Sequence, residues 1–282
     1  MVASRIGVLG RGRLPADEPV LRADDLGVLR GDGLFETMHL RDGRAWLRQE
    51  HLTRLRTGAA AVELTLPADA ALTDLLDEVA AGWPAEVEGA LRLICTRGPE
   101  HGGPPTVYAT LSEVTPTARR DRQEGVSVAT LSLGVPAEAR PELDWLPAGI
   151  KSTSYGASSA ARRWAARAGV DDVLWISSDG YALEGPSANL VWLAGETLCT
   201  VPAGRTGILP GTTVAWLLAH AADVGCGAAE RMVTPTGLRE ADGVWLTSSV
   251  RGLVAVHTLD GEPLPSSPLT RTLQELLGFP LP

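Results

Sequence analysis

Lysine occurs once in this chain, at Lys151, in the segment Pro147-Ala-Gly-Ile-Lys-Ser-Thr-Ser-Tyr155, and the other 24 of the 25 basic residues are arginine. Arginine serves ion pairs and anion binding well, because its charge is fixed and its fork is bidentate. It cannot form a Schiff base with a carbonyl, which requires a primary amine that can lose its proton. Lys151 is therefore the first candidate for covalent amine chemistry. Arginine bias could also leave one lysine behind by chance.

A carboxylate follows in the segment Tyr181-Ala-Leu-Glu-Gly-Pro-Ser-Ala-Asn189, where Glu184 stands just before Gly-Pro, at the predicted end of a strand. A lysine imine coupled to a heterocycle gains most when a carboxylate keeps the ring nitrogen protonated, because the ring is then a stronger electron sink. Glu184 is a candidate for that role. The alternative interpretation is a solvated turn residue.

Two further segments contain groups that bind phosphate. Thr206-Gly-Ile-Leu-Pro-Gly-Thr-Thr213 combines a glycine, hydroxyls and a predicted helix start, and helix N-termini bind phosphate through backbone N–H groups and the helix dipole. Taken alone, the segment is also an ordinary helix cap. Arg54, in His51-Leu-Thr-Arg-Leu55, could contact the same phosphate or extend along the surface. Together the segments supply an amine, an acid for a ring nitrogen and a phosphate site.

The bulk composition excludes several classes of protein. The chain has 282 residues, enough for two domains, and its net charge of −9 argues against nucleic-acid or anionic-membrane partners. Cys95, Cys199 and Cys226 are far apart and lack metal-binding spacing, so they are interpreted as buried thiols in a reducing compartment. Neither a signal peptide nor an apolar run of about 18–20 residues is visible. These observations predict a cytoplasmic location.

The elements that must position these residues alternate between strands and helices, which predicts an α/β or α+β fold in two lobes. We expect a small α/β domain over 1–115, a linker over 116–125, and a larger domain over 126–282 that carries the lysine. Strands are predicted at 34–40, 89–97, 106–111, 126–131, 172–177, 190–193, 243–248 and 252–256. Helices are predicted at 50–64, 68–81, 155–168 and 212–223.

The segments containing Lys151, Glu184 and Thr212, together with Arg30-Gly-Asp-Gly-Leu-Phe-Glu-Thr37 and Glu50-His-Leu-Thr-Arg-Leu55, resemble the class IV (fold type IV) pyridoxal-phosphate enzymes. That family holds branched-chain aminotransferases, D-amino-acid aminotransferases and 4-amino-4-deoxychorismate lyases. The resemblance runs from about Leu21 to His257. It implies a two-domain fold of the D-amino-acid aminotransferase type, with pyridoxal 5'-phosphate between the lobes and a homodimer as the active form.

The resemblance also implies roles for individual residues. Lys151 would form the imine with the cofactor and later carry protons, Glu184 would pair with the pyridine nitrogen, and Tyr155 would bind the phenolate oxygen. The phosphate would be surrounded by Arg54, Leu209, Thr212, Thr213 and Ser249. Ser248-Ser249 replaces the Gly-Thr pair common in branched-chain enzymes, so this end of the phosphate site departs from the family pattern.

Two segments discriminate between members of the family. Phe35-Glu-Thr37 has threonine where branched-chain enzymes have glycine, and this resembles the lyases, in which the hydroxyl can help to move a proton. Thr37 could equally be an ordinary strand residue. Cys95-Thr-Arg-Gly98 resembles the segment that binds a substrate carboxylate, with Arg97 as a bidentate clamp. We therefore favour a lyase that releases pyruvate and forms 4-aminobenzoate, a folate precursor, over an aminotransferase for branched-chain or D-amino acids.

Other classes fit the sequence less well. Gly7-Val-Leu-Gly-Arg-Gly12 lacks the dinucleotide-binding spacing, and Gly185-Pro-Ser-Ala-Asn189 is not a serine nucleophile elbow. The five histidines show no metal-ligand spacing, and His51 and His220 are expected on helix faces. A binding module that kept the fold and lost its chemistry is the non-enzymatic alternative.

Overall fold

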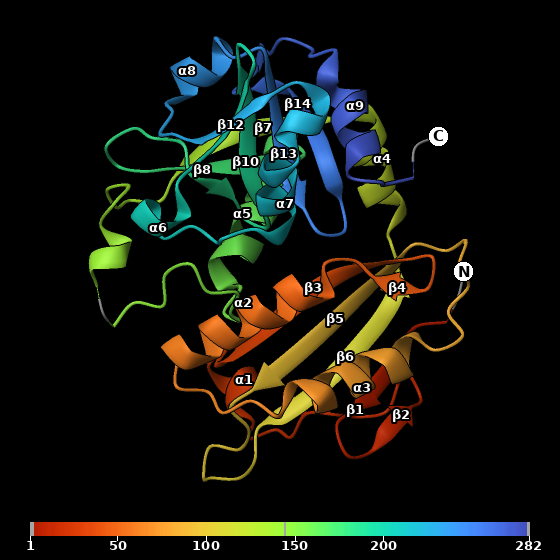
Figure 1. The fold of residues 1–282 in the computed structure, drawn as a ribbon. Helices are drawn as coiled ribbons and strands as arrows, with labels where there is room; N and C mark the ends of the chain where they lie inside the picture. Colours follow the sequence, from red (N-terminus) through yellow and green to blue (C-terminus); the bar gives the residue numbers. More distant parts are fainter. Residues whose placement is uncertain (1–2, 144, 281–282) are drawn as a thin grey trace. The chain divides into compact units, whose positions relative to one another are not determined.

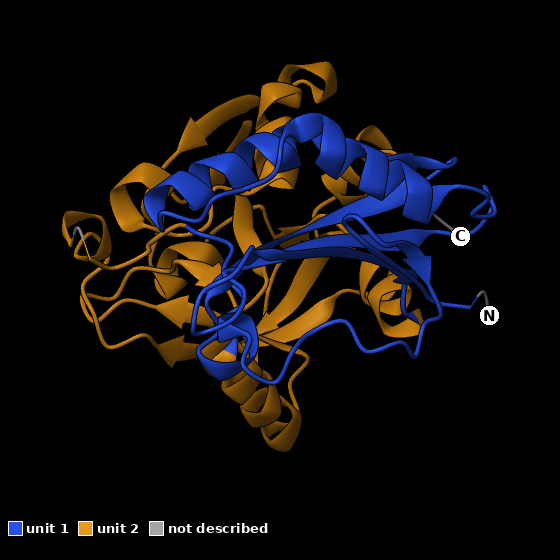
Figure 2. Ribbon diagram, turned by 90° about the horizontal axis from the view of Figure 1, so that it is seen from below, with its two compact units in different colours: residues 1–115, 150–155 blue, residues 116–149, 156–282 orange. Residues whose placement is uncertain are grey.

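The computed structural model describes residues 3–143 and 145–280, which form two compact units, each with its own β-sheet (Figures 1 and 2). Unit 1 comprises residues 1–115 and 150–155, and unit 2 comprises residues 116–149 and 156–282. The mixture of helices and strands in both units confirms the predicted α/β (α+β) class. Within the described residues, no helix is both long enough and apolar enough to cross a membrane.

Over its described residues, unit 1 contains an antiparallel sheet of six strands. Their order is β2 (Gly12–Leu14), β1 (Arg5–Val8), β6 (Thr106–Glu113), β5 (Gly89–Thr96), β3 (Gly33–Arg41) and β4 (Arg44–Ala45). The β3–β4 turn places Asp42 and Gly43 at φ of 50° and 70°, as expected for a tight hairpin turn. The strands predicted at 34–40, 89–97 and 106–111 are thereby confirmed.

Helices α2 (Arg48–Ala61) and α3 (Asp69–Ala80) cover one face of this sheet, while the short α1 (Leu26–Leu29) precedes β3 (Figure 1). Alternate residues of β3 point toward the helices, since successive side chains of a strand lie on opposite faces. The core of unit 1 includes Leu34, Met38, Leu52, Leu55, Leu72, Leu76, Val79 and Leu93. This alternation fixes which β3 residues lie under α2 and which lie on the other face.

Unit 2 contains a mixed sheet of nine strands over its described residues. Seven of them follow the order β12 (Gly227–Glu230), β11 (Thr197–Thr200), β10 (Ala188–Ala194), β13 (Gly243–Ser248), β14 (Gly252–Leu259), β7 (Val126–Ser132) and β8 (Asp172–Ile176). The short β9 (Glu184–Gly185) pairs with β10, and β15 (Glu262–Pro263) pairs with β14. One face packs on a core that includes Leu190, Trp192, Val244, Leu246 and Val254.

The helices of unit 2 include α5 (Gly156–Ala168) and α7 (Thr212–Ala219), close to the predicted positions. The remaining ones are α4 (Pro116–Glu124), α6 (Ala203–Thr206), α8 (Pro235–Arg239), α9 (Leu269–Leu276) and the 3-10 turns η1 (Arg140–Glu142) and η2 (Ala221–Val224). The segment 116–125, expected to be a linker, is thus mostly helix α4. Proline is tolerated at a helix start, so Pro116 did not exclude one.

The three cysteines are free and buried, as expected. Burial raises the pKa of the Cys95 thiol to about 12, so this thiol stays protonated at neutral pH. His51, expected on a helix face, lies on the inward face of α2 and is fully buried. Helix α2 turns it inward, because His51 and Leu55 lie four residues apart on one helix face.

Candidate active site

The segment carrying Lys151 lies along the first half of β3 in unit 1. Phe35 N donates to Lys151 O at 3.0 Å, Thr153 N donates to Gly33 O at 2.8 Å, and Leu34 and Ser152 form an antiparallel bridge. These are the hydrogen bonds of a strand edge, so the backbone of the lysine segment is fixed by β3. Residues 150–155 accordingly belong to unit 1, whereas the sequence analysis placed the lysine in the larger domain over 126–282.

Glycine makes this close approach possible. Gly31 has φ of 68°, and a Cβ added there would lie 3.0 Å from Ser154 Cα. At Gly33 the added Cβ would lie 2.8 Å from Cys95 O and 3.1 Å from Thr153 Oγ1. Side chains at either position would push the lysine segment away from β3, which explains the glycine-rich turn before this strand.

The amine of Lys151 lies over the ring of Phe35, with Nζ 4.4 Å from the ring centroid. Tyr155 packs against the same ring edge to face, at 5.3 Å between centroids and an interplanar angle of 72°. Thr37 is two residues from Phe35 and so extends from the same face of β3. The structure therefore brings three predicted site residues, Lys151, Tyr155 and Thr37, to one face of unit 1.

Arg54 of α2 lies on the other face of β3, the face that α2 covers, and binds Glu36 there. Its Nε donates to Glu36 Oε1 at 2.7 Å and its Nη2 donates to Oε2 at 2.6 Å, a bidentate pair. His51 Nδ1 lies 2.6 Å from the same Oε2. Because an ionised carboxylate only accepts hydrogen bonds, this nitrogen carries the proton. Glu36 is fully buried and Arg54 is 11 % exposed, so the guanidinium is held in place rather than extended along the surface.

The charges in this cluster are set by burial and by the hydrogen bonds. Burial by itself would raise the pKa of Glu36, but the hydrogen bonds from Arg54 and His51 outweigh it, and the pKa falls from 4.5 to about 2. Burial lowers the pKa of His51, and the hydrogen bond to Glu36 opposes this only in part. At neutral pH the cluster therefore comprises an anionic Glu36, a cationic Arg54 and a neutral His51.

Arg97, the predicted clamp for a substrate carboxylate, binds groups of unit 1 itself. Its Nε donates to Asp32 Oδ2 at 2.6 Å, and its Nη1 and Nη2 donate to the carbonyls of Glu63 and Val62 at 3.1 and 2.8 Å. Those carbonyls directly follow the C-terminus of α2, where carbonyls lack intrahelical partners. A substrate carboxylate would have to compete with all three contacts.

In unit 2, Glu184 and Asn189 fix the loop that precedes α7. Glu184 Oε2 accepts from Leu209 N at 3.2 Å, and Asn189 Nδ2 donates to Leu209 O at 2.7 Å. The two residues are direct partners in the β9–β10 pairing. A Cβ on Gly211 would lie 1.9 Å from Asn189 Oδ1, so only glycine fits there. Sequence reasoning did not assign Asn189 a role, since nothing local shows that it reaches residues 20 positions away.

Helix α7 begins at Thr212 with Gly211 as its N-cap, and glycine has no side chain that could cap the helix. The first N–H groups of a helix have no intrahelical acceptor, and the helix dipole adds positive charge there. Thr213, 2 % exposed, has a buried Oγ1 that finds no hydrogen-bond partner among the described residues. A helix N-terminus beside an unsatisfied hydroxyl fits a phosphate group well. The residues present are thus suited to the predicted cofactor.

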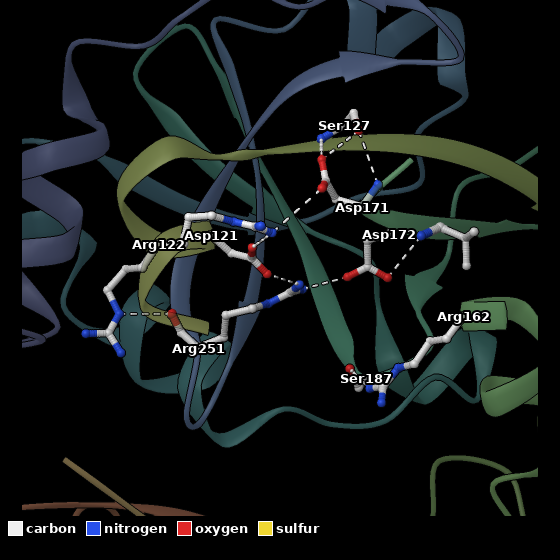
Figure 3. A network of polar contacts seen from close by, with 10 residues as sticks. Asp121, Arg122, Ser127, Arg162, Asp171, Asp172, Ser187 and Arg251 are labelled. Atoms are coloured by element: carbon white, nitrogen blue, oxygen red, sulfur yellow. Dashed lines mark hydrogen bonds and ion pairs between the residues drawn. The ribbon is translucent and has the colours of Figure 1, made fainter. Parts of the chain in front are cut away.

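Ser249 lies in the turn between β13 and β14, and two buried or half-buried arginines hold that turn (Figure 3). Arg122 of α4 donates to the carbonyls of Val250 and Arg251 at 3.1 and 3.2 Å. Arg251 in turn pairs with Asp172 at 2.7 Å and Asp121 at 3.5 Å. The conformation of the turn is therefore tied to α4 and β8 by charge pairs.

Figure 3 also shows the contact that restrains the turn after Glu184. Arg162 Nη2 of α5 donates to Ser187 Oγ at 2.6 Å. Each unit thus presents a part of the predicted set. Unit 1 carries Lys151, Tyr155, Thr37 and Arg54, and unit 2 carries Glu184, Leu209, Thr212, Thr213 and Ser249. Glu36 escaped the sequence analysis, although an acidic residue at an inward position of an alternating strand was a visible signal.

Comparisons with known proteins show the family to which the chain belongs. A sequence profile of the family described as amino-transferase class IV matches residues 33–259. The chain is 39% identical over 267 residues to a bifunctional aminodeoxychorismate lyase / D-amino acid transaminase of Mycobacterium tuberculosis, covering 92% of each protein. Its fold matches the PLP-bound form of a hypothetical aminotransferase from Mycobacterium tuberculosis, with a TM-score of 0.93, 39% identity and 98% coverage of both chains.

A second solved structure, a fold IV-transaminase from Curtobacterium pusillum, matches with a TM-score of 0.91 and 34% identity over 97% of both chains. These likenesses extend over nearly the whole chain and confirm the predicted fold type. The protein belongs to the class IV aminotransferase family.

Proposed function

We propose that this protein is a pyridoxal-phosphate-dependent 4-amino-4-deoxychorismate lyase that forms 4-aminobenzoate and pyruvate. Pyridoxal phosphate is its cofactor, in keeping with its family and with the PLP-bound form of the matching structure from Mycobacterium tuberculosis. When bound, the cofactor supplies an electron sink for the substrate's amino carbon. The observation that carries the proposal is the placement of Thr37 on the same face of β3 as the Phe35 ring that contacts Lys151.

The chain's own groups would divide the work. Lys151 supplies the primary amine and removes the substrate's ring proton, and Thr37 passes a proton to the departing pyruvate portion. Tyr155 binds the phenolate oxygen and Glu184 the pyridine nitrogen. Phosphate would be held by Arg54, Leu209, Thr212, Thr213 and Ser249. Hydrogen bonds fix Arg54 to Glu36 and Leu209 to Asn189. This supports the assignments, because a group that is already fixed loses little entropy on binding.

A D-amino-acid aminotransferase is the second candidate. The relative from Mycobacterium tuberculosis carries both activities in its name, so both chemistries are compatible with one site. In that alternative Thr37 would be a strand residue without a chemical role, and Lys151 would act as the base that takes a proton from the amino acid. We further propose a cytoplasmic homodimer as the working form.

One assay separates the two candidates. The holoenzyme is incubated with 4-amino-4-deoxychorismate, and separately with a panel of D- and L-amino acids together with a keto acid. The lyase proposal expects 4-aminobenzoate and pyruvate in equal amounts. Absence of both products, with rapid conversion of the bound cofactor to its amine form by an amino acid, would establish the transaminase instead.

The lysine is tested by colour. We expect the purified protein to be yellow and to lose its visible absorbance in Lys151→Arg, which retains the charge and removes imine chemistry. Borohydride reduction followed by peptide mapping should label Lys151. A label on another residue, or a colourless wild type that pyridoxal phosphate does not restore, would contradict the assignment.

A further inference from the structure

A second unsatisfied hydroxyl lies in unit 2, on Thr247 of β13. Its side chain is 1 % exposed, and its Oγ1 has no hydrogen-bond partner among the described residues. Leaving a buried hydroxyl unpaired lowers folding stability, because the group loses its hydrogen bonds to water. Valine has nearly the same shape, suits a buried strand and carries no such cost. A ligand that accepts the hydrogen bond would remove the penalty.

The pairing of the strands shows which side of the sheet this hydroxyl occupies. Thr247 lies directly across from Asn189 in the β10–β13 pairing, and direct partners in a sheet share one face. Asn189 binds Leu209 O and packs against Gly211, the N-cap of α7. The Thr247 side chain therefore emerges on the face that receives the start of α7. The neighbouring Leu246 belongs to the core on the opposite face.

The first turn of α7 contributes Thr213, whose Oγ1 is likewise buried and unsatisfied. Both hydroxyls thus belong to the same face of the unit 2 sheet and the helix start that covers it. The helix dipole already favours an anion at this N-terminus, whose N-cap is Gly211. Two unpaired donors beside it indicate that the acceptor is a group with several oxygens, since one oxygen rarely accepts from all of these donors.

We propose that Thr247 is a further phosphate-binding residue, whose hydroxyl donates a hydrogen bond to the phosphate of the cofactor at the start of α7. The inference rests on the proposed cofactor site and adds a residue that neither the motif comparison nor the helix-terminus argument assigned. It also assigns Asn189 a positioning role, since its amide seats the loop between the strand and the helix. A trapped water that satisfies Thr247 without contacting phosphate is the competing explanation.

The test compares Thr247→Val, Thr247→Ser and Thr200→Val in the full chain. Thr200 is a matched control on the same sheet: it is also buried, but its Oγ1 donates to Leu190 O at 2.7 Å. For each variant, dissociation constants are measured for pyridoxal phosphate, for pyridoxal without phosphate and for inorganic phosphate, together with the thermal midpoint of the cofactor-free protein.

If Thr247 binds phosphate, Thr247→Val raises the dissociation constants of pyridoxal phosphate and of inorganic phosphate by about tenfold or more, since a hydrogen bond to a charged group is lost. The dissociation constant of pyridoxal stays unchanged. Its cofactor-free midpoint stays equal or rises, because an unpaired hydroxyl has been removed. Thr247→Ser, which retains the hydroxyl, binds like the wild type. Thr200→Val lowers the midpoint and leaves the ratio of the pyridoxal phosphate and pyridoxal constants unchanged.

Unchanged phosphate affinity in Thr247→Val overturns the inference in favour of a trapped water. Equal weakening of pyridoxal and pyridoxal phosphate also overturns it, because the effect is then structural. Should Thr247→Val fail to fold, weakened phosphate binding in Thr247→Ala relative to Thr247→Ser decides the question. Failure of the wild type to bind pyridoxal phosphate refutes the proposed function. The role of Thr247 is then decided by the dissociation constants for inorganic phosphate alone.

Discussion

At the scale of single residues, the cluster of Glu36, His51 and Arg54 fixes the position of a cation proposed to bind phosphate. The carboxylate of Glu36 binds the Nε–Nη2 edge of the guanidinium, and the carboxylate is itself fixed by a neutral imidazole. Removing one member of a buried ion pair is costly, because the other is left without compensation. The cluster therefore links the stability of unit 1 to the position of Arg54.

Acid should weaken the protein through this cluster. The pKa of Glu36 is about 2 in the folded protein and near 4.5 otherwise, so its stabilising contribution is complete above pH 4.5 and is lost as the pH falls toward 2. The difference corresponds to about 3 kcal/mol. His51 acts in the same direction below pH 6.5, because its pKa is also lowered. We expect the free energy of unfolding of Glu36→Gln to fall less steeply with decreasing pH than that of the wild type, as measured by urea unfolding between pH 7 and pH 2.5.

If Arg54 binds the phosphate, Glu36→Gln should lower the affinity for pyridoxal phosphate more than the affinity for pyridoxal. His39→Gln, which alters the other buried histidine–carboxylate pair of unit 1, with Glu88, serves as the control. It should leave that ratio of affinities unchanged. An acid limb that is identical in Glu36→Gln and wild type would contradict the role assigned to Glu36.

Arg97 should behave as a structural residue. Arg97→Met removes the contacts to Asp32 and to the carbonyls after α2, so we expect a loss of about 1–3 kcal/mol in the free energy of unfolding. The KM for the substrate should change by less than about threefold. Arg30→Met, which breaks an exposed pair with Glu100, is the control. A stable Arg97→Met enzyme with a strongly raised KM would contradict this expectation and support the role of Arg97 in binding a substrate carboxylate.

At the scale of elements, the sequence predicted those whose hydrophobic pattern is local. The alternation of β3 and the helical spacing of α2 and α3 follow from residues next to one another in the chain. Helix α4 was missed because its polar composition resembled a linker. Its position is explained by Arg122, which is 2 % exposed and binds carbonyls more than 120 residues away.

The site residues were predicted by type and motif, but their partners were not. Pairing of the Lys151 segment with β3 and the reach of Asn189 to Leu209 both depend on how distant strands come together. A single sequence contains no direct signal for such long-range contacts. Glu36 was not identified for the same reason, because its contact with Arg54 forms only when α2 packs over β3.

The turn that carries Ser249 should depend on its charge pairs. Arg251→Met leaves the buried carboxylate of Asp172 without the cation of Arg251 and leaves buried Asp121 paired with Arg120, so we expect a loss of about 3–5 kcal/mol in unfolding free energy. Pyridoxal phosphate should also dissociate faster, as followed by stopped-flow absorbance. Arg271→Met, which breaks an exposed pair with Glu275 on α9, should change neither quantity. Equal effects in the two variants would refute this role of the turn.

At the scale of the whole molecule, the chain leaves unit 1 after residue 115, returns for residues 150–155 and leaves again. The candidate groups are distributed over both units, so the proposed activity would require both. We expect the holoenzyme to elute as a homodimer, with a mass about twice the 29.6 kDa of one chain in light scattering coupled to size exclusion. A monomer with full activity would refute the dimer proposal.

The return of the chain to β3 also has a consequence for biosynthesis. When residue 115 leaves the ribosome, the first half of β3 still lacks the neighbour that the 150–155 segment provides, and an open strand edge promotes pairing between chains. The N-terminal sheet must wait for residues 116–149 to be made, which takes a few seconds at about 5–20 residues per second. A nascent chain paused in this interval would be a natural client for chaperones.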